Sequence, residues 1–365
     1  MRVSFLGVIK GLVVIAVLAA VAIAGYQAYT RLPGLLKEFA PESGAIAVTP
    51  GQEVIVTVPK GASLSQVGQI LHENGVISSR LVFRLVALIR GEQRSVKAGD
   101  YVLKTGSDAG DVLDLLISGK TLMLAVTVPE GYNMYQVADL FQQLGIMTRD
   151  EFLATARDEA FLTELGLEAP SLEGYLFPDT YFFRPSEKGD GKLIIRRMAQ
   201  RFRDVYAKHV KETADLHGWT MYQVVTLASL IEKEARESEH PLVSAVFHNR
   251  LRLNMKLQCD PTVIYGIKPM GSKITRADLD RKHPYNTYQN LGLPPGPIAN
   301  PGKASLIAAV KPAEADYLYF VAKNDGSHQF SNNLKEHNDA VKHYQLQPRG
   351  EPTGIMPTSK GVGSR

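Results

Sequence analysis

Two glutamates at the end of an apolar segment are the strongest candidates for acid–base chemistry in this sequence. Glu232 and Glu234 close the run LASLIEKEA at residues 227–235, which has the apolar spacing of a helix. Each lies beside apolar side chains of the preceding turn, and such neighbours raise the pKa of a carboxyl group. A proton held at neutral pH is what a general acid needs. Periodicity does not choose between the two, and either can instead be an exposed glutamate paired with Lys233 or Arg236.

Polar and aromatic side chains gather in three segments that follow this helix. They are LQCDPTVIYG at 257–266, HPYNTY at 283–288 and the stiff loop GLPPGPIANPG at 292–302. Amide, hydroxyl, carboxylate and phenol groups of this kind bind the hydroxyl and acetamide groups of sugars. The predicted substrate-binding residues are Gln258, Asp260, Thr262, Tyr265, Asn286, Tyr288 and Asn300. Asp260 can instead cap a short helix, and the stiffness of the loop can be purely structural.

Other common catalytic chemistries lack their sequence patterns here. The chain has no HExxH motif, no GxSxG motif and no cysteine pair, and its 9 histidines do not show zinc-ligand spacing. Residues 296–303 resemble a phosphate loop, but the glycine spacing is too long and Ala304 replaces the required serine or threonine. Cys259, the single cysteine, has no evident histidine partner for a thiol nucleophile. We therefore expect neither a metal nor a cofactor.

Length and charge indicate a folded protein with more than one domain. The 365 residues carry a net charge of +4, which is small for this length and argues against a nucleic-acid partner. One cysteine excludes a framework of intramolecular disulfides. The spacing of apolar residues in the second half predicts helices at 193–209, 219–236, 242–251 and 333–344, a strand at 317–322, and a long irregular loop at 284–302.

The N-terminal segment is apolar enough to cross a membrane. Residues 11–28 form a nearly unbroken apolar run, close to the ~20 residues that a spanning helix needs, and Arg2 and Lys10 precede it. The predicted segments are a cytoplasmic N-terminus at 1–9, a transmembrane helix at 10–30 and a linker at 31–50. This places the rest of the chain on the outer side of the cytoplasmic membrane. The alternatives are a cleaved signal peptide, with Ala22-Ile23-Ala24 as a candidate cleavage site, and a buried core helix.

A repeated pattern predicts a duplicated strand–turn–helix unit. The sequence VTVPKG at 56–61 recurs as VTVPEG at 126–131, and a proline and a glycine turn the chain before an amphipathic helix. After the first copy, residues 79–90 suggest a second helix and 99–103 a short strand. Strand, helix, helix, strand is the order of a LysM module, which holds N-acetylated glycans; a plain spacer has equal weight. The predicted domains are a LysM-like subdomain at 51–122, a catalytic domain at 123–345 and a disordered tail at 346–365.

These motifs together resemble those of the YceG-like family of endolytic murein transglycosylases. They are EGYLFPDTYFF, LASLIEKEA, HNRL followed by MKLQCDPTVIYG, YNTY, GLPPGPIANPG, and YLYFVAKNDGSHQFS with EHN. Their order and spacing make the match specific over residues 54–344. The resemblance implies an α+β protein with an N-terminal transmembrane helix, a LysM-like βααβ subdomain and a mixed α/β catalytic domain related to goose-type lysozyme.

The resemblance also implies a reaction and a proton donor. It assigns the acid to the first glutamate of IEKE, Glu232, which cleaves the MurNAc–GlcNAc bond within glycan strands and leaves a 1,6-anhydro-MurNAc end. It assigns Asp260 to positioning and no chemistry to the Cys259 thiol. The implied function is termination of nascent strands, with peptidoglycan strands, the membrane and peptidoglycan synthases as partners. The alternatives are a non-catalytic glycan-binding scaffold of wall synthesis and a lysozyme-like hydrolase, in which water attacks instead of the sugar hydroxyl.

Overall fold

The computed structural model describes residues 49–346, which form two compact units. One unit runs to Leu124 and includes Arg184–Ser186; the other contains Ala125–Phe183 and the chain from Glu187 onward. The predicted transmembrane helix at 10–30 and the predicted disordered tail at 346–365 lie outside the described residues, except for residue 346. Among residues 49–346, no helix is both long and apolar enough to span a membrane.

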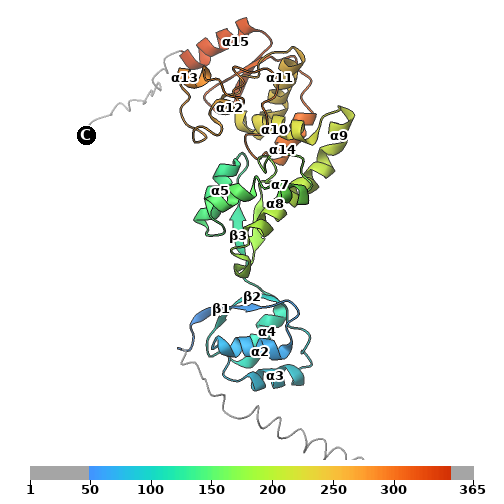
Figure 1. Ribbon diagram of the computed structural model, residues 1–365, viewed down its shortest axis with the longest axis vertical. Helices are drawn as coiled ribbons and strands as arrows, with labels where there is room; N and C mark the ends of the chain where they lie inside the picture. Colours follow the sequence, from blue (N-terminus) through green and yellow to red (C-terminus); the bar gives the residue numbers. More distant parts are fainter. Residues whose placement is uncertain (1–48, 347–365) are drawn as a thin grey trace, which may run out of the picture. The chain divides into compact units, whose positions relative to one another are not determined.

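The first unit is a pair of antiparallel strands with helices on its buried face (Figure 1). Its elements are β1 (Glu53–Val58), α2 (Leu64–Glu73), α3 (Arg80–Ile89), β2 (Gly99–Lys104) and α4 (Ala109–Ser118). The strands pair from Glu53 opposite Lys104 to Val58 opposite Gly99. Alternate side chains such as Val56 and Leu103 are buried in the same apolar core as the helices. The predicted strand–helix–helix–strand order is present, and α4 follows it as a helix that the sequence did not predict.

The predicted repeat is confirmed as two copies of one local structure. In the first copy a capping box joins Ser63 to Gln66 at the start of α2. In the second copy the capping box joins Asn133 to Gln136 at the start of α5 (Met134–Gln143), which follows β3 (Leu124–Thr127). Each box satisfies backbone donors that would otherwise be unpaired in the first helical turn. The strand–turn–helix pattern therefore follows from local sequence in both places.

The second unit begins with small elements around β3. Strand β3 pairs with β4 (Thr180–Phe183), and the hydroxyls of Thr127 and Thr180 lie 2.9 Å apart across the pair. The accompanying helices are α6 (Arg149–Thr155), α7 (Glu159–Glu164), α8 (Gly191–His209) and α9 (Lys211–Leu216). The prediction of a helix at 193–209 is confirmed by α8.

Helix α10 (Met221–Glu234) is the central helix of the second unit. Its eight consecutive residues from Val224 to Ile231 are buried on every side. A helix that is apolar all round must be enclosed by other elements. Those that contact it include α11 (His240–Arg252), α12 (Asp260–Ile264) and α14 (Lys303–Val310); α13 (Arg276–Leu279) contacts α12. The predicted helices at 219–236 and 242–251 are confirmed by α10 and α11, and residues 284–302 form the expected irregular loop.

A hairpin and a final helix complete the second unit. Strands β5 (Tyr319–Ala322) and β6 (His328–Ser331) pair antiparallel, with Tyr319 opposite Ser331. The turn between them uses Asn324 with φ 66° and Gly326 with φ 85°, which are left-handed conformations typical of these residue types. Helix α15 (Leu334–Val341) packs against the hairpin and continues into one π-helical turn (Lys342–Leu346). The strand predicted at 317–322 and the helix at 333–344 are confirmed, with shorter regular cores.

Candidate active site

Glu234 is the last residue of α10, and its carboxyl group is buried. The helix ends there because Ala235 takes an extended conformation, with φ −146° and ψ 170°. The oxygen Oε1 has no hydrogen-bond partner within the described residues. Burial raises the pKa of Glu234 to about 7, and the charge of Asp260 adds to the rise, while hydrogen bonds from the Cys259 thiol and the Asp260 backbone oppose it. This carboxyl group can therefore hold a proton near neutral pH and release it near neutral pH.

Glu234 lines a cavity of 480 Å³ that also contains three of the predicted substrate-binding residues. These are Gln258, Asp260 and Tyr288. The other walls come from the β5–β6 hairpin and α15, which lie in the same unit as α10 (Figure 1). A hollow with convergent polar groups and a carboxyl group of raised pKa is the usual form of an active site. In this segment the exposed side chains of Gln258 and Asp260 alternate with the buried side chains of Leu257 and Cys259.

Arg250, part of the HNRL motif but given no role by the sequence analysis, connects the segments on this side of the cavity. Its guanidinium group is buried and donates to the backbone oxygens of Leu318 at 2.7 Å and Leu257 at 2.8 Å. It also donates to Oε1 of Gln258 at 3.2 Å. Gln258 has φ 53°, a left-handed conformation that costs a non-glycine residue roughly 1–2 kcal/mol. Backbone strain of this kind is found where the position of a side chain matters for function.

Asp260 and Tyr288 form the opposite polar edge of the cavity. The Tyr288 hydroxyl donates to Oδ1 of Asp260 at 2.6 Å. Asp260 is also the first residue of α12, where a negative charge is favourable. The pKa of the Cys259 thiol is raised well above its usual value by burial and by the nearby Glu234. The thiol is therefore neutral, which is consistent with giving it no nucleophilic role.

Glu232 faces a different environment, although it is only two residues from Glu234. Its Oε2 accepts a hydrogen bond from the Gly302 backbone amide at 3.0 Å and from Oγ of Ser305 at 2.6 Å. Gly302 is the N-cap of α14, whose N-terminus attracts negative charge. Ser305 Oγ also lies 3.1 Å from Nδ1 of His240. Glu232 is thus bound as an acceptor between α10 and α14, and it does not line the 480 Å³ cavity.

A second carboxyl group, that of Glu130, lies beside Glu232. A Cβ atom added to Gly302 would overlap Oε1 of Glu130, so this carboxyl group rests directly on the start of α14. Burial and the negative charges of Glu232 and Glu237 raise the pKa of Glu130. Glu130 belongs to VTVPEG, the second copy of the repeat, and the sequence did not indicate that it lies close to Glu232. The pair is an acidic cluster on a helix N-terminus, separate from the cavity that Glu234 lines.

Four predicted substrate-binding residues occupy structural positions instead. Thr262, Tyr265, Asn286 and Asn300 are buried, with at most 6% of their surface exposed. The Asn286 amide donates to backbone oxygens of Leu279 and Arg281. The Asn300 amide joins Leu176 to Tyr132, and Thr262 donates to the Cys259 carbonyl. Because protein groups already hold these polar atoms, the four residues support the surrounding loops in this structure, and their role in sugar binding stays a prediction.

Tyr265 supports a buried glutamate outside the cavity. Its hydroxyl donates to Oε2 of Glu173 at 2.8 Å, and the Met134 backbone amide donates to the same carboxyl group. Burial raises the pKa of Glu173 to about 7. Glu173 thereby caps the start of α5 and ties it to α12. A raised pKa alone does not mark an active site, because Glu173 is enclosed and does not line any of the larger hollows of the described chain.

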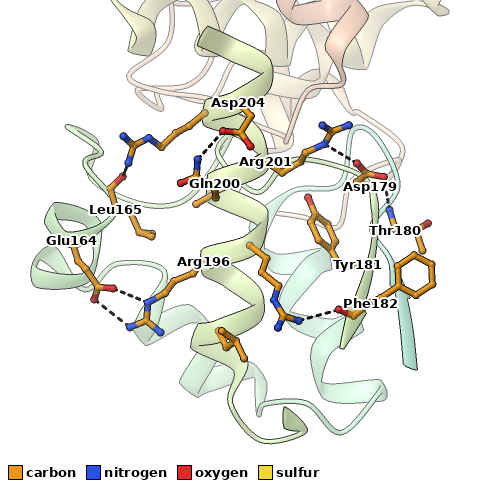
Figure 2. A pocket seen from close by; sticks show the side chains of 14 residues that line it. Glu164, Leu165, Asp179, Thr180, Tyr181, Phe182, Arg196, Gln200, Arg201 and Asp204 are labelled. Atoms are coloured by element: carbon orange, nitrogen blue, oxygen red, sulfur yellow. Dashed lines mark hydrogen bonds and ion pairs between the residues drawn. The ribbon is translucent and has the colours of Figure 1, made fainter. Parts of the chain in front are cut away.

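A larger hollow, of 730 Å³, lies beside α8 and is lined by arginines that are already paired (Figure 2). Arg196 binds Glu164 on one side of the helix, and Arg201 binds Asp179 on the other. The guanidinium group of Arg196 lowers the pKa of Glu164. These ion pairs attach neighbouring segments to α8. Size therefore does not identify the site.

Within residues 49–346, no group of three or more histidine, cysteine, aspartate or glutamate side chains is arranged to hold a metal ion.

Comparison with known proteins shows the family of this chain. The model of the YceG-like family matches residues 56–343. The chain belongs to the YceG-like family. It is 36% identical over 307 residues to a Bacillus subtilis (strain 168) protein named endolytic murein transglycosylase, which covers 80% of this chain and 84% of that protein. A Streptococcus pneumoniae serotype 2 (strain D39) protein of the same name is 29% identical over 323 residues, covering 79% of this chain and 58% of its own length.

A solved YceG-like structure extends the comparison to the fold. The putative YceG-like protein of Listeria monocytogenes is 33% identical and superposes with a TM-score of 0.55, covering 80% of this chain and 99% of that one. The mixed helix-and-strand architecture is therefore that of the YceG-like family, as the motifs predicted. The family match begins within β1 and ends within the π-helical turn after α15.

Proposed function

We propose that this protein is an endolytic murein transglycosylase that cuts glycan strands of peptidoglycan. The activity is named for relatives that share 36% and 29% identity over about four-fifths of this chain. The observation that best supports it in the molecule itself is the Glu234 carboxyl group, buried and without a partner on Oε1, in a polar cavity. We propose that the substrate is a nascent glycan strand and that the cut terminates its elongation.

We further propose Glu234, rather than Glu232, as the proton donor. The resemblance assigned this role to Glu232, and that assignment stays a prediction. Geometry supports Glu234 better, because its carboxyl group has a pKa of about 7 and opens on the cavity. The Glu232 carboxylate instead accepts two hydrogen bonds at the start of α14. An acid needs a proton and a place beside the substrate; Glu234 can hold the proton and lines the cavity in which we place the glycan.

The proposed reaction uses one carboxyl group twice. Protonated Glu234 gives its proton to the oxygen between MurNAc and GlcNAc, and the bond from that oxygen to the anomeric carbon breaks. The acetamide of MurNAc supports the developing positive charge, as in substrate-assisted glycosidases. The Glu234 carboxylate then takes the proton of the 6-hydroxyl while its oxygen bonds to the anomeric carbon. No water is consumed, the carboxyl group is regenerated, and the product has a 1,6-anhydro end. Gln258, Asp260 and Tyr288 are proposed to position the sugars.

Mass spectrometry of strands digested by the purified full-length protein tests this proposal. We expect new ends that are lighter by one water than hydrolytic ends. Ends that contain the elements of water would instead indicate a lysozyme-like hydrolase and a water activated near Asp260. Retained binding without cleavage would favour a non-catalytic scaffold. Parallel digestion with Glu234→Gln and Glu232→Gln assigns the acid.

We propose that the chain is anchored by residues 10–30 in the cytoplasmic membrane, with both described units on the outer side and peptidoglycan synthases as partners. The support is the apolar N-terminal sequence with preceding positive charges. Protease protection of the N-terminus in intact cells, with digestion of residues after 50, is expected.

We also propose a LysM-like role for the first unit, because its strand–helix–helix–strand order matches that module. Measurable binding of glycan strands by the full-length chain should then fall when the first unit is altered. The goose-lysozyme relationship of the second unit stays a prediction.

A further inference from the structure

His337 on α15 is, after Glu234, a second residue of the cavity with a buried side-chain atom that lacks a hydrogen-bond partner. Nδ1 of His337 is buried and without a hydrogen bond among the described residues. Only three other buried side-chain atoms in residues 49–346 share that property, and one of them is Oε1 of Glu234. Both residues line the same 480 Å³ cavity. A buried polar atom without a partner costs roughly 1–3 kcal/mol, so two in one cavity indicate a ligand that supplies their partners.

The surroundings of His337 fix its ring and keep it neutral. The imidazole stacks on Tyr319 with ring centroids 5.1 Å apart and an angle of 24° between planes. The Arg250 guanidinium group lies 5.2 Å from the centre of the same Tyr319 ring. Burial, and then the positive charge of Arg250, lower the pKa of His337. A neutral imidazole has one donor and one acceptor nitrogen, which suits sugar hydroxyl and acetamide groups.

We propose that His337 is a substrate-contacting residue that hydrogen-bonds, through Nδ1, the saccharide held in the cavity beside Glu234. The inference rests on the proposed function, and it names a residue of the same cavity for which the sequence analysis gave no role. The histidine comes from α15, about a hundred positions after Glu234 in the chain. The hairpin and α15 would then contribute directly to substrate binding as well as covering the core.

The competing explanation is that His337 serves only to pack against Tyr319, and two substitutions separate these roles. His337→Phe keeps an aromatic ring for the stack and removes both nitrogens. His337→Asn removes the ring but keeps a polar group near the position of Nδ1. Asp339→Asn is the control, because Asp339 is an exposed residue of the same helix that does not line the cavity. Thermal unfolding of every variant checks that it is folded.

Cleavage kinetics with purified glycan strands give the first result. We expect His337→Phe to lower kcat/KM roughly ten- to hundredfold with an unchanged Tm, which is the loss of one ligand hydrogen bond. His337→Asn should keep more activity than His337→Phe despite a lower Tm, and Asp339→Asn should match the native protein. The reverse order, with His337→Phe fully active and His337→Asn impaired, would assign His337 to packing and overturn the inference.

Binding of uncut strands distinguishes failure of this inference from failure of the proposed function. In the Glu234→Gln background, His337→Phe should weaken glycan affinity by roughly the same factor as it lowers kcat/KM if the contact is made in the ground state. Native protein that binds strands but leaves them intact would reject the transglycosylase proposal, while weaker binding by His337→Phe would still support this contact. Equal affinity and equal cleavage in native protein and His337→Phe would overturn the contact alone. Native protein that neither binds nor cuts strands would reject both.

Discussion

Glu232 and Glu234 lie on opposite sides of the last turn of α10, and their carboxyl groups have different surroundings. Residues two apart on a helix are separated by about 200° around its axis, so Glu232 and Glu234 cannot share one environment. Glu232 meets the backbone amide of Gly302 and the hydroxyl of Ser305 at the start of α14. Glu234 meets a cavity in which Oε1 has no partner. Proximity in sequence therefore says little about the chemistry of a carboxyl group, which depends on the donors that tertiary structure brings to it.

Replacement of Glu234 by glutamine should have the largest effect. The amide cannot transfer a proton, so we expect cleavage to fall by about 100- to 10,000-fold. The fold should be retained, because a neutral amide replaces a carboxyl group whose burial already disfavours its charge. The yield of shortened glycan strands and thermal unfolding measure the two expectations. Near-native cleavage would remove Glu234 from the reaction.

Replacement of Glu232 by glutamine is the matched test and should affect cleavage less than about tenfold. The glutamine oxygen can still accept from Gly302 and Ser305, whereas Glu232→Ala leaves both donors without their acceptor. We expect Glu232→Ala to lower the free energy of unfolding by about 1–3 kcal/mol. Complete inactivity of a well-folded Glu232→Gln protein would restore the assignment made from the resemblance. Denaturant unfolding and cleavage assays on both variants give the answer.

Glu234 and the enclosed Glu173 both have a pKa of about 7, so both should affect how stability depends on pH. Only Glu234 should also affect how the cleavage rate depends on pH. Raised from an ordinary value of 4.5, each carboxyl group binds more protons in the folded state than in the unfolded state. Stability should therefore fall as pH rises from about 4.5 to about 7, with no further loss from these groups above that range.

Loss of the proton from Glu234 should lower the cleavage rate, whereas loss of the proton from Glu173 should not. Because the donor must be protonated in the free enzyme, kcat/KM should decline tenfold per pH unit above about 7. Replacement of Glu173 by glutamine should weaken the pH dependence of stability and leave this kinetic limb in place. A kinetic limb that disappears in the Glu173→Gln protein would place the essential proton there instead. Rate profiles and chemical unfolding at several pH values supply both curves.

Tyr265→Phe tests the support role assigned to a residue first predicted to bind sugar. The substitution removes the donor to Glu173 and should lower the free energy of unfolding by about 1–3 kcal/mol. Cleavage at a temperature where the variant is folded should stay within about threefold of native, because Tyr265 lies outside the cavity. A large rise in KM with unchanged stability would return Tyr265 to the substrate site.

The smallest expected effect is a difference in stability between two substitutions at Gln258. Glycine adopts φ 53° without strain, whereas alanine retains the left-handed cost, so Gln258→Ala should be less stable than Gln258→Gly by roughly 1 kcal/mol. Both lose the amide that Arg250 holds, so the two should lose a similar share of cleavage activity. Unequal activities at equal stability would show that backbone shape at residue 258, and not its amide, matters for the reaction.

The predictable part of this protein is the part set by neighbours in sequence. The proline and the turn glycine of the two VTVP segments predicted the repeat, and in the structure Ser63 and Asn133 cap the two helices that follow. The eight buried residues of α10 were likewise visible as an apolar run. Among the predicted site residues, Gln258 and Asp260 line the cavity with Glu234, and the sequence shows them as polar side chains that interrupt an apolar segment. The burial of Asn286 and Asn300 could not be predicted, because buried polar groups that hold loops have the same composition as sugar-binding groups.

By itself, the sequence determined the family, the element order and the choice of two candidate acids, because these depend on local pattern and spacing. Only the tertiary structure decided which carboxyl group lies in a cavity and which one is held by α14. It also brought Arg250 and His337 to the cavity, from positions that local spacing does not connect with Glu234. The physical reason is that desolvation and hydrogen bonding depend on atoms far apart in the chain, and these two effects set the pKa of a carboxyl group.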